Sequence, residues 1–253
     1  MEIEQKNFFS NIMIEGHAMF KKDPMSKPMT HERIIDSLKM AIPIAIYAII
    51  YLTWFHHLEV TPQVHYTEVH TALDDKIPFL EIFVVPYFAL FFYVSFVVLY
   101  FLFKYEKEDY YKLLSFLITG MTVFLIVSTL FPNIQHLRPT TMPRDNIFTH
   151  MVAYLYKTDT PTNLWPSIHV YNSIGVFIGA YTSKRVSRRG KIFSGVLSTL
   201  IILSTMFIKQ HSTFDVATAF ALGLIVYVIV YRSELVVGIL HRHDAEEEER
   251  AVN

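Results

Sequence analysis

A histidine and an aspartate stand four residues apart in the segment IKQHSTFDV, residues 208–216: His211 and Asp215. If a helix begins near Ser212, both side chains lie on one face and can form a hydrogen bond. A carboxylate that holds an imidazole fixes its tautomer and makes its other nitrogen a better base or nucleophile. An isolated pair of this kind is more often a capping carboxylate beside an interfacial histidine. The pair therefore indicates catalysis only if other reactive groups lie near it.

A second histidine, His169, stands at the start of another apolar stretch. It follows Pro166 and Ser167 in the segment DTPTNLWPSIHV, residues 159–170. Serine is a favoured helix N-cap, and the free backbone N–H groups at a helix start bind anions such as phosphate. The simpler interpretation is a capped helix with a histidine at its boundary.

Two cations, Arg138 and Lys209, accompany these histidines. The planar guanidinium of Arg138 matches the geometry of phosphate oxygens. The simpler interpretation of both cations is that they reach toward lipid headgroups. Taken together, two histidines, a carboxylate, two cations and a helix start could transfer a phosphoryl group without a metal, because they supply a nucleophile, an acid and positive charge.

Long apolar runs must position these residues. Of the 253 residues, 52% are hydrophobic and 18% are charged, whereas soluble domains average roughly 25% charged. A membrane-spanning helix needs about 20 mostly apolar residues. Six segments meet or approach this length: 35–55, 79–103, 113–131, 167–183, 192–208 and 215–231. The sequence therefore predicts an all-α polytopic membrane protein, a bundle of six transmembrane helices.

The distribution of lysine and arginine predicts the orientation of this bundle. Both residues gather before residue 34, at 104–112, at 184–191 and in the tail. Six spans place all four segments on one side, which the positive-inside rule makes cytoplasmic. We therefore expect a cytoplasmic N-terminal segment (1–33), a six-helix transmembrane domain (34–234) and a charged cytoplasmic tail (235–253). The histidine segments fall on the extracytoplasmic side. A plasma membrane fits this pattern, and an endomembrane fits it equally.

Several classes of function are disfavoured. The net charge of −1 gives no field that would attract nucleic acid. The absence of cysteine excludes disulfides, thiolate metal sites and a cysteine nucleophile. The histidines at 56, 57, 65 and 70 lack paired ligand spacing, so we expect no metal site and no cofactor. Aromatic residues at 87–93 are expected to face lipid or to pack within the bundle.

The order of these residues resembles that of the type 2 phosphatidic acid phosphatase superfamily, membrane lipid phosphatases and phosphotransferases related to vanadium haloperoxidases. Its motifs read Lys-x6-Arg-Pro, Pro-Ser-Gly-His and Ser-Arg-x5-His-x3-Asp. The resemblance covers about residues 131–216, with matches at Arg138-Pro139, at Pro166-Ser167-Ile168-His169 and at Ser204, His211 and Asp215. Phe131, Ile168 and Thr205 replace the motif lysine, glycine and arginine. Two phosphate-binding cations are thus absent. Our candidates to replace them are Lys209 for one and Arg144, His136 or Gln135 near the first motif.

The resemblance implies a role for each matched residue. His211 attacks phosphorus and forms a phosphohistidine, Asp215 orients His211, and His169 protonates the leaving group. Arg138 and Ser167 bind phosphate oxygens, and no metal is needed.

The activity implied by the resemblance is hydrolysis of a phosphomonoester or diphosphate of a membrane lipid at the extracytoplasmic face. The expected partners are this lipid phosphate and the surrounding membrane lipids. One alternative is a lipid phosphotransferase similar to the sphingolipid synthases, which share the His-x3-Asp spacing. Another is a non-catalytic protein that binds or transports lipid on the same fold.

Overall fold

The computed structural model describes residues 31–240 and 242, apart from residues 62, 64, 105, 106 and 234. The predicted N-terminal segment and most of the predicted tail lie outside this range. The described chain is predominantly helical. Its α-helices are α2 (His31–Val60), α3 (Val84–Lys104), α4 (Lys107–Leu130), α5 (Ile147–Thr158), α6 (Ile168–Thr182), α7 (Arg188–Phe207) and α8 (Thr213–Tyr227). The predicted helical class is confirmed.

In the part of the chain that the structure describes, five helices are long and apolar enough to cross a membrane: Ile34–Val60, Glu81–Lys104, Lys107–Leu130, Arg188–Phe207 and Thr213–Arg232. Five of the six predicted segments fall on these helices. The last of them continues from α8 into one π-helical turn, Val228–Arg232. The sixth predicted segment, 167–183, corresponds to α6, which has only 15 residues and rises about 22 Å. It is shorter because Ser167 caps its start and Ser183 is already extended.

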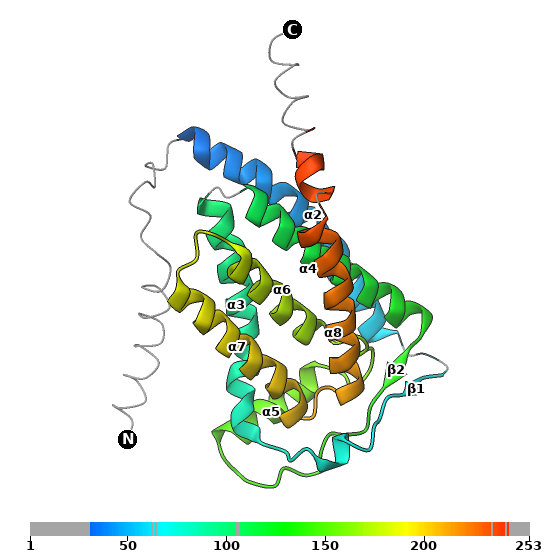
Figure 1. The fold of residues 1–253 in the computed structure, drawn as a ribbon. Helices are drawn as coiled ribbons and strands as arrows, with labels where there is room; N and C mark the ends of the chain where they lie inside the picture. The colour runs from blue at the N-terminus through cyan, green and yellow to red at the C-terminus, as the bar shows by residue number, and fades with distance from the viewer. Residues whose placement is uncertain are drawn as a thin grey trace.

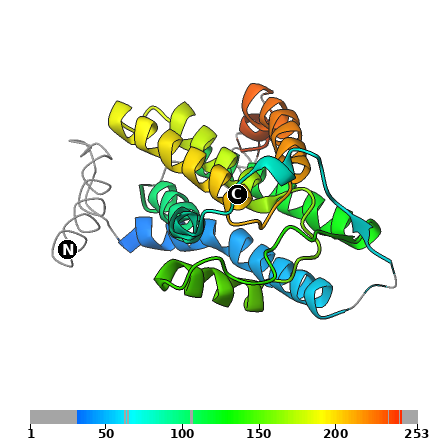
Figure 2. The same cartoon turned by 90° about the horizontal axis from the view of Figure 1, so that it is seen from below.

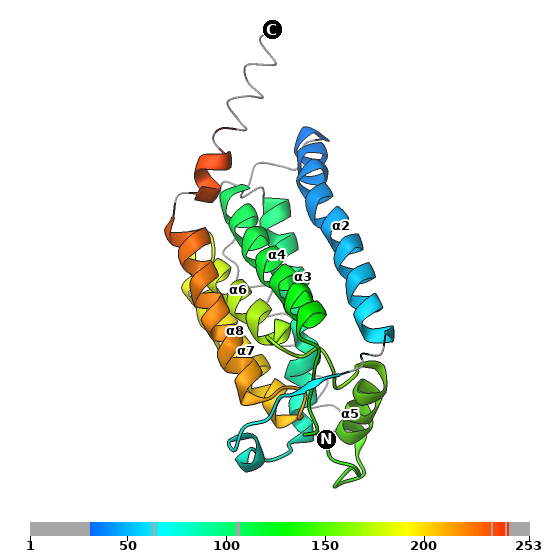
Figure 3. The ribbon, with the colours of Figure 1, turned by 90° about the vertical axis from the view of Figure 1, so that its right-hand side faces the viewer.

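Helices α2, α3, α4, α6, α7 and α8 run alternately down and up (Figures 1 and 3). The central helix α6 contacts α3, α4, α7 and α8. Seen from below, α5 and α2 lie along one edge of the bundle, with α8 along the opposite edge (Figure 2). Small residues allow the close packing around α6. A Cβ atom at Gly120 would lie 2.0 Å from the ring of Tyr171, and one at Gly175 would lie 2.5 Å from the ring of Phe116.

Three loops meet at one end of the bundle, the lower end in Figure 1. Strands β1 (Thr67–Glu68) and β2 (Asn133–Ile134) pair in parallel there, and Ile134 also bridges to Thr162. The buried Asn133 side chain accepts hydrogen bonds from the backbone N–H groups of Leu164 (2.7 Å) and Trp165 (3.2 Å). These bonds fix the segment before α6 against the segment after α4, so the start of α6 is held in place.

Helix α5 was not predicted, because its residues are too mixed in polarity to resemble a span. Asn146 and Thr149 form a capping box at its start. Val152 and Leu155 on its inner face pack with Val84, Tyr87 and Ile208 in a small apolar cluster. Through this cluster α5 supports the start of α3 and the end of α7, which both contribute to the site described next.

Candidate active site

The structure brings His169, His211 and Asp215 into one hydrogen-bonded chain. His211 Nδ1 lies 3.4 Å from Asp215 Oδ2, and His211 Nε2 lies 3.2 Å from His169 Nδ1. The side chains of His211 and Asp215 are only 4% and 0% exposed. Histidines from two separate segments and the predicted carboxylate thus meet at the starts of α6 and α8, where His211 and Asp215 are buried.

Local geometry at the start of α8 explains the orientation of Asp215. Ser212 is the N-cap of this helix, and Ser212 N–H donates to Asp215 Oδ2 at 2.9 Å, as in a capping box. This bond turns the carboxylate back over the first turn toward His211. On the other side, the N–H groups of Gln210 and His211 both donate to Thr205 O. Lys209 reverses the chain between α7 and α8 in a left-handed conformation, with φ of 55°.

Tyr87 of α3 extends the chain beyond His169. Its Oη lies 2.8 Å from His169 Nε2, and the two rings stack with centroids 4.7 Å apart. Tyr87 was expected only to pack or to face lipid. The sequence offered no signal for this contact, because Tyr87 belongs to an apolar helix and carries no motif.

Arg138 lies behind this chain and is joined to it through Gln210. Its Nη2 donates to Gln210 Oε1 at 2.6 Å, and Gln210 Nε2 lies 2.9 Å from Asp159 Oδ2 and 3.4 Å from Tyr87 Oη. Burial lowers the pKa of Arg138. Burial also raises the pKa of the Asp159 carboxyl, although Arg138 opposes that rise. Gln210 is therefore a buried bridge between the cation and the histidines, which the sequence did not indicate.

The buried Nε of Arg138 has no hydrogen-bond partner among the described residues. Its Nη1 and Nη2 also donate to backbone oxygens. They bind the carbonyl oxygens of Asp159 (2.8 Å), Thr160 (3.1 Å) and Tyr156 (3.3 Å). The guanidinium also lies 4.6 Å from the centroid of the Tyr156 ring. In this arrangement Arg138 stabilises the loop between α5 and α6.

Lys209 binds the first loop. Its Nζ donates to the carbonyl oxygens of Asp74 (2.8 Å) and Ile77 (2.6 Å), and burial lowers its pKa. The Asp74 carboxylate in turn accepts from Ser212 Oγ (2.6 Å) and Thr213 N–H (2.7 Å). These contacts clamp residues 74–77 to the turn that carries His211. Lys209 was predicted to be a phosphate ligand, but the structure places its ammonium on these carbonyls.

The other two predicted ligands have structural partners. Arg144 pairs with Glu81, which also accepts from Asn146 Nδ2 at 3.0 Å. Arg144 is therefore held at the start of α3 and is not brought into the histidine chain. Ser167 is fully buried, and its Oγ accepts from Val170 N–H at 3.3 Å as the N-cap of α6. Their predicted contacts with phosphate stay predictions.

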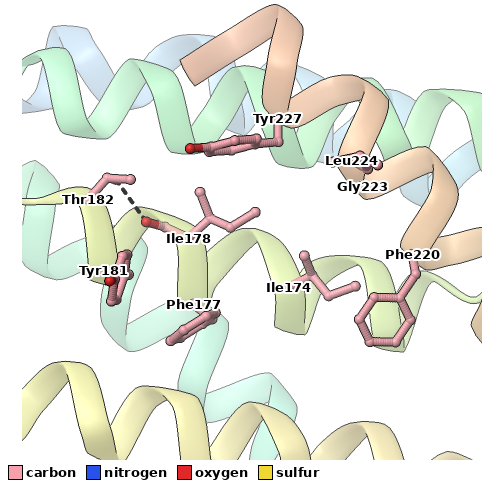
Figure 4. A pocket seen from close by; sticks show the side chains of 9 residues that line it. All are labelled: Ile174, Phe177, Ile178, Tyr181, Thr182, Phe220, Gly223, Leu224 and Tyr227. Carbon is pink, nitrogen blue, oxygen red and sulfur yellow. Dashed lines mark hydrogen bonds between the residues drawn. The ribbon is translucent and has the colours of Figure 1, made fainter. Parts of the chain in front are cut away.

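An apolar groove of about 310 Å³ lies between α6 and α8 (Figure 4). It is lined by Ile174, Phe177, Ile178, Tyr181, Thr182, Phe220, Gly223, Leu224 and Tyr227. Its first residues, Ile174 and Phe220, each follow a member of the histidine chain by five positions, about 7.5 Å along a helix. The groove therefore follows the two helices whose first turns carry His169 and Asp215.

Among the described residues, no three histidine, cysteine, aspartate or glutamate side chains gather in a way that could hold a metal ion. In the first loop, His70 Nε2 instead lies 2.9 Å from Asp75 Oδ1.

The fold and site thus define a helical protein with membrane-spanning character and a buried Asp–His–His–Tyr chain at one end of its bundle. No protein-family model, no curated protein and no solved structure matches this chain.

Proposed function

We propose that this protein is a metal-independent lipid phosphate phosphatase that works through a phosphohistidine. The observation that carries the proposal is the Asp215–His211–His169 chain. Three groups with complementary roles in phosphoryl transfer, drawn from two separate segments, meet in one buried place. The nearby Arg138–Gln210 pair supplies positive charge behind them.

Each residue of the chain has a defined task in this mechanism. Asp215 accepts a hydrogen bond from His211 Nδ1–H, so the lone pair of His211 lies on Nε2 and can attack phosphorus. As the new N–P bond forms, the bond from phosphorus to the leaving oxygen breaks. His169, starting as imidazolium, gives its Nδ1 proton to that oxygen. Neutral His169 then takes a proton from water, whose oxygen attacks the phosphohistidine. Phosphate leaves, and His211 is regenerated.

The substrate in this proposal is an amphiphile with a phosphomonoester or diphosphate head. The groove between α6 and α8 supports it, because an apolar channel beside the site suits a lipid chain. We further propose that α6 completes a set of six spans, with both termini cytoplasmic and the site at the extracytoplasmic face of the plasma membrane. The lysine and arginine distribution supports this orientation.

A second candidate, a lipid-binding protein without turnover, is favoured by the direct contact between the histidines. A phosphorus atom must approach the nucleophile to about 3–3.5 Å before it reacts. In this structure that position is occupied by His169 Nδ1, at 3.2 Å from His211 Nε2. Catalysis therefore requires the headgroup to separate the two rings, whereas a binding protein has no such requirement.

Phosphate release by purified protein tests the proposal. The substrates are phosphatidic acid and a polyprenyl diphosphate in mixed micelles containing a chelator. We expect His211→Ala to lower release by at least about 10³-fold. The matched control is His150→Ala, because His150 is 73% exposed and pairs only with Asp145. Release by His211→Ala equal to that of the wild type would refute the nucleophile.

Added lipid alcohols test the transfer alternative in the same assay. A phosphorylated alcohol formed in place of free phosphate identifies a phosphotransferase that uses the same residues. Lipid binding with neither hydrolysis nor transfer, and without a trapped phosphohistidine, favours the non-catalytic candidate.

A further inference from the structure

Tyr87 contacts His169, the proposed acid, on the side of the ring opposite to His211. Its hydroxyl is 2.8 Å from His169 Nε2, the nitrogen on the side of the ring away from His211. Tyr87 is 1% exposed, and it reaches His169 across 82 positions of sequence. Its ring also stacks on the imidazole with centroids 4.7 Å apart. The hydroxyl and the ring together restrict both the tilt and the rotation of His169.

The donor and acceptor pattern around the chain is consistent from end to end. Asp215 accepts from His211 Nδ1–H, so His211 Nε2 is an acceptor and His169 Nδ1 is the donor that faces it. When His169 is neutral, its Nε2 then accepts from the Tyr87 hydroxyl. Gln210 Nε2–H donates to that hydroxyl at 3.4 Å. Each donor in this pattern faces an acceptor, whereas Asp215 Oδ1 is buried without a partner among the described residues.

We propose that Tyr87 is a positioning residue that directs His169 Nδ1 at the reaction centre. This inference rests on the proposed phosphatase function. During the reaction the Nδ1–H bond of His169 breaks as the proton moves to the leaving oxygen. The Nε2–H remains and donates to Tyr87 Oη. A hydroxyl both donates and accepts, so Tyr87 can hold the ring whether or not Nε2 carries a proton.

A hydroxyl suits a histidine that acts first as an acid and then as a base. A carboxylate in its place would stabilise the imidazolium and oppose release of the proton. An N–H donor in its place would pair only with an unprotonated Nε2. The Tyr87 hydroxyl is neutral, so it does not stabilise the imidazolium as a carboxylate would. It can also accept from Nε2–H or donate to an unprotonated Nε2.

Tyr87→Phe tests this role, because it removes only the hydroxyl and keeps the stacked ring. The matched control is Tyr93→Phe on the same helix. The Tyr93 hydroxyl is also buried, and it binds Ser194 (2.5 Å) and Ser198 (3.1 Å) away from the histidines. Both variants lose a buried hydroxyl, but only Tyr87→Phe disturbs His169.

The readout is the dependence of kcat on the leaving group. With an alkyl lipid phosphate, whose poor leaving group needs an acid, we expect Tyr87→Phe to lower kcat about 10- to 100-fold with little change in KM. With an aryl phosphate such as p-nitrophenyl phosphate, which needs little acid assistance, the loss should be below about threefold. Tyr93→Phe should show no such difference. Equal losses for both substrates, or no loss with the alkyl phosphate, overturn the inference.

Nitrogen NMR of the His169 imidazole tests the same contact without turnover. We expect the ¹⁵N shifts of Nδ1 and Nε2, which report where the proton resides, to change in Tyr87→Phe and to stay unchanged in Tyr93→Phe. Unchanged shifts in Tyr87→Phe overturn the inference. If the wild-type protein turns over no lipid phosphate, the proposed function is refuted. The NMR shifts do not require turnover, so they distinguish that outcome from a failure of the Tyr87 inference.

Discussion

Replacing Asp74 by asparagine should loosen the first loop from the start of α8. Asp74 is 2% exposed and accepts three hydrogen bonds. Its Oδ2 accepts from Ser212 Oγ (2.6 Å) and Thr71 N–H (2.8 Å), and its Oδ1 accepts from Thr213 N–H (2.7 Å). A negative charge at this position also interacts favourably with the N-terminus of α8.

The size of the effect follows from these bonds. An asparagine has one acceptor oxygen, so its NH₂ group must face either Thr213 N–H or Thr71 N–H. An N–H left without a partner costs about 1–3 kcal/mol, and each remaining bond loses about 1 kcal/mol when its acceptor is no longer charged. Both threonines are only half-buried, and water at their amides offsets part of this cost. We therefore expect the attachment of the first loop to the start of α8 to lose about 3 kcal/mol. The equilibrium constant for opening of this loop should then rise roughly 150-fold.

Hydrogen exchange measured by mass spectrometry checks this value in micelle-solubilised protein. Amides at 71–77 and 209–215 should exchange roughly 100-fold faster in Asp74→Asn. The matched control is Asp75→Asn, since the Asp75 side chain is 67% exposed and pairs with His70. Similar rates in both variants, or an acceleration below about threefold in Asp74→Asn, would show that Asp74 does not hold the loop.

Acid should weaken the same clamp. Burial raises the pKa of the Asp74 carboxyl, but the hydrogen bonds from Ser212, Thr213 and Thr71 outweigh burial and leave the pKa below its ordinary value. A carboxyl with a lowered pKa in the folded state stabilises that state above about pH 3.9, and the stabilisation is lost as the pH falls through the folded pKa. After correction for the intrinsic pH dependence of amide exchange, protection at 209–215 should therefore fall below about pH 3.9 in wild-type protein, and it should not in Asp74→Asn.

Three further substitutions test other parts of the site. Arg138→Lys cannot bind the carbonyls of residues 156–160 and Gln210 together, so thermal unfolding should show a loss of about 2–3 kcal/mol. Arg144→Gln leaves Glu81 without its cation and should lower the unfolding temperature. Gly223→Leu should fill the groove, because a Cβ there lies 3.5 Å from Ile174, at ordinary contact distance. It should raise KM for a long-chain lipid phosphate and leave KM for a short-chain analogue unchanged. Unchanged stability in Arg138→Lys or Arg144→Gln, or an unchanged KM for the long-chain lipid in Gly223→Leu, would contradict the contacts assigned to that residue.

The helices could be predicted where a single stretch of chain carried the signal. The apolar runs at 79–103 and 113–131 correspond to α3 and α4, because the length and hydropathy of a span are properties of the run itself. Helix α5 was missed because only one face of its 12 residues is apolar. Its stability depends on the capping box and on residues of α3 and α7, which a local pattern does not include.

The same distinction, between contacts within one segment and contacts between distant segments, applies within the site. The pairing of His211 with Asp215 could be expected from sequence because residues four apart at a helix start lie within about one turn of each other. The partners of Tyr87, Asp74 and Lys209 could not be expected. These contacts cross 82, 138 and 135 positions.

By itself, the sequence determined the helical class, the long apolar segments and the reactive residue types at helix starts. Only the tertiary structure decided that His169 contacts His211, that Tyr87 holds His169 and that Lys209 binds the first loop. The physical reason is that hydropathy and helical spacing are set within a few turns of one chain segment. A hydrogen bond between distant segments instead depends on which loops the packed helices bring to the same end of the bundle, and on which buried donors and acceptors must then be satisfied.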